Sequence, residues 1–74
     1  MKLQINDSGS WKNFMSFHGD SLEEIDDVMY HARLLLNYSA RQVSMRVTDD
    51  RNNPLHYLDG PGKNWRRAGH IQKD

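Results

Sequence analysis

The 74-residue chain contains no cysteine, which excludes disulfide bonds and thiolate metal sites. It has no apolar run near the roughly 18–20 residues that cross a membrane, and its first residues lack a signal-peptide core. Net charge is absent too, since ten basic residues balance ten acidic ones, so no overall charge attracts nucleic acid. We therefore expect a cytoplasmic protein without a membrane partner.

The short length limits the size of the core. A chain of this size is near the lower limit at which one core can fold unaided. We expect a single domain at residues 1–62, followed by a basic C-terminal tail at residues 63–74 that is partly disordered in the isolated protein. Association would add stability, so a homodimer is one of the expected states.

Residues 21–38 predict an amphipathic helix, around which the other segments pack. Ser21 and Glu24 have the spacing of a capping box, and acidic residues crowd the first two turns, where the helix dipole favours them. Apolar residues then recur at steps of three and four and form one stripe. The stripe consists of Ile25, Val28, Met29, Ala32, Leu35 and Leu36.

Alternating apolar and polar residues predict four short strands, at residues 1–5, 11–18, 43–48 and 55–58. Turn-forming residues separate the strands within each pair, at 6–10 and 49–54. The order predicts an α+β fold, a small antiparallel sheet of two hairpins with one amphipathic helix across one face (ββαββ).

The strand alternation also predicts which side chains the helix leaves uncovered. With Met15, Phe17, Leu55 and Tyr57 turned toward the helix, the other face carries Lys12, Phe14, His18, Arg46, His56 and Leu58. Basic and aromatic residues on one open face can stack single-stranded bases beside a phosphate track. They can equally form a protein interface.

Catalytic and cofactor signatures are missing. The four histidines have no common metal-ligand spacing, and Gly60-Pro61-Gly62-Lys63 lacks the serine or threonine of a phosphate-binding loop. No serine lies in a nucleophile elbow. We expect a non-enzymatic protein with no cofactor and no metal site.

Two further segments are candidate contact sites. Trp65 beside Arg66 and Arg67 is either an anchor for a partner or a side chain that folds back over the edge of the core. The acidic start of the helix can steer a partner electrostatically. The predicted partner-binding residues are Phe14, Arg46, Trp65, Arg66, Arg67, Glu23, Glu24 and Asp27.

The closing run of residues 55–65, LHYLDGPGKNW, completes a small cysteine-free chain with a hairpin-helix-hairpin plan. In size and layout the chain resembles the small early and accessory proteins of tailed bacteriophages that bind and disable host machinery. The resemblance implies a stoichiometric inhibitor in the host cytoplasm, which occupies a surface of a nuclease, polymerase or defence complex. It assigns no individual residue. A host protein is therefore the first predicted partner.

Two alternatives remain open at this stage. One is a small nucleic-acid-binding protein that uses Lys12, Phe14, Arg46, Lys63, Trp65, Arg66 and Arg67. The other is a structural homodimer with no separate ligand. Nucleic-acid binding should weaken steeply with salt, because counterion release drives it. A protein interface built on buried aromatic residues should not.

Overall fold

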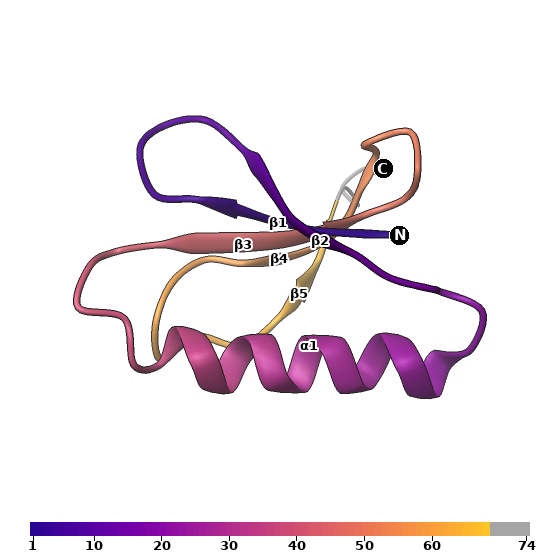
Figure 1. Ribbon diagram of the computed structural model, residues 1–74. Coiled ribbons are helices and arrows are strands. Elements are labelled where there is room, and N and C mark those ends of the chain that lie inside the picture. Colours follow the sequence, from indigo (N-terminus) through magenta and orange to yellow (C-terminus); the bar gives the residue numbers. More distant parts are fainter. Residues whose placement is uncertain (69–74) are drawn as a thin grey trace, which may run out of the picture.

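A computed structural model describes residues 1–68 of the chain, which form one helix and one antiparallel sheet (Figure 1). The helix α1 spans Leu22–Leu36. Ser21 caps it as predicted, because its Oγ accepts a hydrogen bond of 3.2 Å from the backbone N–H of Glu24. At the other end the backbone N–H of Asn37 donates to the carbonyl of Arg33 at 3.2 Å.

The sheet has five strands in the order β2-β1-β3-β4-β5, and each neighbouring pair is antiparallel. The strands are β1 at Lys2–Asn6, β2 at Lys12–Ser16, β3 at Ser44–Thr48, β4 at Pro54–Leu58 and β5 at Arg66–Arg67. Strand β1 pairs with both β2 and β3, and so joins the two hairpins into one sheet. Helix α1 lies along one face of that sheet (Figure 1).

The predicted α+β class is confirmed, but the predicted ββαββ plan is incomplete. The turn at Gly60-Pro61-Gly62 returns the chain, and β5 then pairs with β4 through Arg66 opposite Tyr57 and Arg67 opposite His56. Arg66–Arg67, which the sequence places in the tail, thus extend the sheet. The rest of the predicted tail, residues 69–74, lies outside the described residues, so its predicted disorder stays a prediction.

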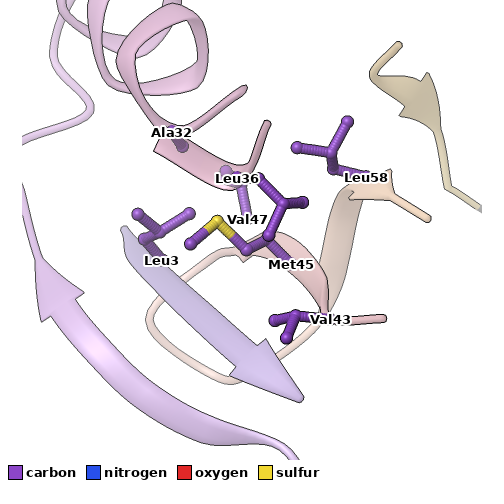
Figure 2. Packing of buried hydrophobic residues seen from close by; sticks show 7 residues of the cluster. All are labelled: Leu3, Ala32, Leu36, Val43, Met45, Val47 and Leu58. Atoms are coloured by element: carbon purple, nitrogen blue, oxygen red, sulfur yellow. The ribbon is translucent and has the colours of Figure 1, made fainter. Parts of the chain in front are cut away.

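The core lies between α1 and the three central strands. Figure 2 shows seven buried side chains that point toward one another, namely Leu3, Ala32, Leu36, Val43, Met45, Val47 and Leu58. Val47 and Leu58 are fully buried, and Met45 is 2% exposed. The alternation of Val43, Met45 and Val47 therefore identified the inner face of β3 correctly.

Two irregularities in the strand pairing change which residues face the helix. Between β1 and β2 the register shifts, so that Leu3 lies opposite Met15 while Gln4 lies opposite Asn13, which leaves Phe14 as an extra residue. Between β3 and β4 the register shifts again, and Leu55 is the extra residue. An extra residue of this kind reverses the alternation of the strand beyond it.

The predicted face assignment is therefore wrong for several residues of β2 and β4. Leu58, expected on the open face, lies opposite Met45 in the core. His56 faces the helix as Leu58 does, because His56 pairs with Val47. Tyr57 lies on the other face of the sheet. Phe14 lies on the helix side, beside Met15. Lys12, which pairs with Ile5, belongs to that side as well.

Candidate functional site

An apolar groove lies between β2 and α1. Its volume is about 280 Å³. Leu3, Phe14, Met15, Asp27, Val28, His31, Ala32, Leu35 and Met45 line it. We call this the edge groove, because β2 is the last strand on its side of the sheet.

The edge groove exposes large apolar side chains that the core does not use. Phe14 is 52% exposed, Met15 41% and Leu35 57%. Phe14 is itself the extra residue of β2, and its side chain lies on the helix side, outside the buried core. Single exposed apolar residues are ordinary, but several that line one groove are typical of an interaction site.

The backbone of β2 offers a second means of binding. Among residues 1–68 it pairs with β1 along one edge only, and all five of its residues are exposed. An unpaired edge of this kind presents a row of N–H and C=O groups to an added strand. The opposite edge of the sheet differs, because β5 has only two residues and both are arginine. Short, charged edges resist pairing.

Acidic side chains from the helix border the edge groove. Asp27 lines it, and Glu23 and Glu24 lie one turn earlier on the exposed first turn of α1. Within residues 1–68, none of these three carboxylates forms an ion pair. The groove therefore combines an apolar floor with one lining carboxylate, Asp27, and two further carboxylates on the preceding turn of the helix.

The opposite face of the sheet carries two neighbouring aromatic rings, each with an arginine against it. The guanidinium of Arg46 lies 4.4 Å from the ring centroid of Trp11, and that of Arg66 lies 4.8 Å from the centroid of Tyr57. The two rings lie 6.1 Å apart and are tilted by 53°. We call these four residues the aromatic row. Cation–π contacts of this kind stabilise both members.

Hydrogen bonds fix both ends of the aromatic row. Arg46 donates through Nε to Oε1 of Gln4 at 2.7 Å, and the Gln4 amide, only 5% exposed, donates to Oδ1 of Asn13 at 2.8 Å. Arg66 donates two hydrogen bonds to Asp59, at 2.6 and 2.9 Å. These hydrogen bonds hold the pKa of the Asp59 carboxyl below its ordinary value.

Trp65 folds back on the domain, as one of the two predicted alternatives requires. Its indole Nε1 donates to the carbonyl of Met29 at 2.7 Å, and its ring packs against the core. The neighbouring arginines point to different faces, because Arg66 joins the aromatic row while Arg67 lines a depression beside the helix. These three adjacent residues therefore do not form one contact site.

Six of the eight predicted partner-binding residues divide between two surfaces, while Trp65 packs against the core and Arg67 lines a separate depression beside the helix. Phe14 and Asp27 meet at the edge groove, with Glu23 and Glu24 nearby, whereas Arg46 and Arg66 lie in the aromatic row. Sequence reasoning missed Trp11, Tyr57 and Gln4, because the extra residues in β2 and β4 could not be located. A signal for Leu35 was present, since it lies at the margin of the helical stripe.

His56 gives the fold a pH dependence. Burial and the nearby Arg67 hold its pKa below the ordinary value of 6.5, and Asp26 opposes them. A histidine of lowered pKa binds protons more readily when unfolded, so its contribution to stability is complete above pH 6.5 and is lost as the pH falls below that value.

We expect the urea concentration at the unfolding midpoint to decrease when the pH is lowered from about 7.5 to about 5.5. The substitution His56→Gln should make that decrease smaller. The exposed His18→Gln is the matched control, and an unchanged pH dependence in His56→Gln would contradict the assignment.

Other kinds of site find no support in the described part of the chain. Among residues 1–68 no three His, Asp or Glu side chains lie close enough to hold a metal ion. No helix within the same residues is long and apolar enough to cross a membrane. Over residues 1–68, fold and surface together define a small α+β domain whose edge strand β2 offers one long unpaired edge. Comparison with protein-family models, curated proteins and solved structures found no match to the chain.

Proposed function

We propose that this protein is a protein-binding module that accepts an extended segment of a partner along the free edge of β2. The edge groove beside that strand carries the proposal. Backbone groups of an added strand pair with those of β2, while every second side chain enters the groove. Phe14, Met15 and Leu35 supply the apolar contacts, and their exposure in the isolated chain is explained by the missing partner segment.

The rim of the edge groove specifies the chemistry of the partner segment. Asp27 lines the groove and Glu24 lies on the exposed turn before it, without ion-pair partners among the described residues. Complementary charge sets specificity and the rate of encounter at such interfaces. The partner segment should therefore be an extended strand with alternating apolar residues and a flanking lysine or arginine.

The proposed activity is occupation of a partner's surface. A module that adds a partner strand to its own sheet prevents that strand from making its other contacts. This inhibition requires no catalytic reaction at the groove. The resemblance to host-inhibitory phage proteins favours a bacterial enzyme or defence complex as the target. Together these points make the protein an inhibitor that acts by stoichiometric binding.

The test compares two aromatic-to-lysine substitutions in a pull-down from nuclease-treated bacterial lysate. Phe14→Lys places a charge at the edge groove and should reduce retention of the bound protein about tenfold or more, as for a central interface residue. Tyr38→Lys makes the same change at a side chain that is 88% exposed beyond the helix end, and should retain the protein. Circular dichroism checks that both variants are folded.

Amide hydrogen exchange on the purified complex then tests the binding mode. Strand addition should protect the outward amides of residues 12–16, because they gain hydrogen-bond partners from the added segment. The proposal fails if Phe14→Lys retains as much of the captured protein as Tyr38→Lys. It also fails if β2 gains no protection in the complex.

A further inference from the structure

The aromatic row lies on the face of the sheet opposite the edge groove and plays no part in the function proposed above. We infer that this face is a second site, which binds single-stranded nucleic acid. The inference is independent of the edge groove, because the two sites share no residue.

The rings of the aromatic row are held in place before any ligand binds. Trp11 precedes β2 and Tyr57 lies in β4, yet both are half-buried on the same face, each with a guanidinium against its ring. Hydrogen bonds to Gln4 and Asp59 fix those guanidinium groups in turn. A fixed platform of partly exposed rings can stack nucleobases without rearranging, and such stacking tolerates any base.

Charge on this face favours a polyanion. Arg46 bonds to the neutral amide of Gln4 and makes no ion pair within residues 1–68. On the same face of β1, two residues before Gln4, Nζ of Lys2 lies 3.1 Å from the neutral Oδ1 of Asn52. Arg46 is therefore available to phosphate groups. The charge of Lys2, in contrast, also acts on the nearby Asp50 carboxylate, whose pKa is lowered first by the N-terminal amine and further by Lys2.

Acidic residues of the helix disfavour a phosphate backbone on that side of the sheet. Glu23, Glu24 and Asp27 lack ion-pair partners in the described part of the chain, so they repel a phosphate backbone. A single strand is the form that fits, because stacking on Trp11 or Tyr57 needs a base that is not already stacked within a duplex.

Tryptophan fluorescence can report binding at this site directly. Trp65→Phe leaves Trp11 as the sole indole, and a thymidine oligonucleotide of about 12 residues should quench it at low salt. The logarithm of the binding constant should fall with the logarithm of salt concentration by about 0.7 per phosphate contact. Arg46→Gln should reduce that slope by about 0.7, since it removes one such contact.

Arg33→Gln is the matched control, because it removes the same charge from the helix. It should leave the slope unchanged. Anisotropy of a labelled oligonucleotide should show that Trp11→Ala weakens binding about 10- to 100-fold. If Trp11→Ala does not fold, the salt dependence of Arg46→Gln tests the inference instead. A glutamine at position 46 is still polar and can lie beside Gln4, so this variant should fold.

Three results would overturn the inference. The first is the absence of quenching at low salt, and the second is an equal loss of slope in Arg46→Gln and Arg33→Gln. The third is binding of duplex DNA as tightly as single strands. If nucleic-acid binding at the aromatic row is disproved, the proposal for the edge groove is unaffected. The edge groove is tested separately, by Phe14→Lys and by the protection of β2 from hydrogen exchange.

Discussion

Replacing Leu58 by alanine should lower the free energy of unfolding by about 2–5 kcal/mol, the range for truncating a fully buried leucine. Leu58 is 0% exposed and lies opposite Met45, beneath the helix. A domain of 74 residues has a total stability of about 4–11 kcal/mol, so this single change removes a large share of it. Urea unfolding should show a lower midpoint with an unchanged slope.

Leu55→Ala is the matched control for this prediction. It makes the same chemical change within the same strand, but Leu55 is the extra residue of β4 and is only half-buried. Its cost should be clearly smaller than that of Leu58→Ala. A larger cost for Leu55→Ala would mean that the simple alternation predicted from the sequence, and not the shifted register, describes β4.

Replacing Trp65 by alanine should cost about 3 kcal/mol or more, as expected for removing a tryptophan that packs against a core. The indole covers the core beside the helix and donates to the Met29 carbonyl at 2.7 Å. Trp65→Phe keeps an aromatic ring there and loses the hydrogen bond, so it should cost about 1 kcal/mol. Thermal and urea unfolding of the two variants measure the difference.

The result also decides between two roles of Trp65. If it belongs to the fold, Trp65→Ala should destabilise the protein, while Trp65→Phe retains any captured partner. If Trp65→Ala left the stability unchanged but abolished capture, Trp65 would be the partner anchor and its contact with the helix would be incidental. The pull-down and the unfolding measurement must therefore be made on the same samples.

Local signals in the sequence predicted the helix and the inner face of β3. The Ser21 cap depends on residues within one turn, and the inner face of β3 follows from an unbroken alternation. Neither needs knowledge of distant segments. This explains why the α+β class could be predicted from the sequence.

The candidate sites were harder to predict because they depend on pairing between distant segments. The positions of Phe14 and Tyr57 follow from one extra residue in β2 and another in β4, and nothing in the local sequence locates either. Arg66 and Arg67 form a strand only because β4 provides an edge for them. The sequence predicted Phe14 and Arg46 as contact residues on one face, but the structure places them on two faces of the sheet.

The contrast between the two ends of the sheet limits how this protein can assemble with itself. Growth of a sheet into a fibre requires each added copy to offer a fresh edge at its far end. Here two copies that met through β2 would each turn β5, with its two arginines, outward. Within residues 1–68, the short, charged β5 edge disfavours further pairing, so contact through β2 favours a dimer over a growing fibre.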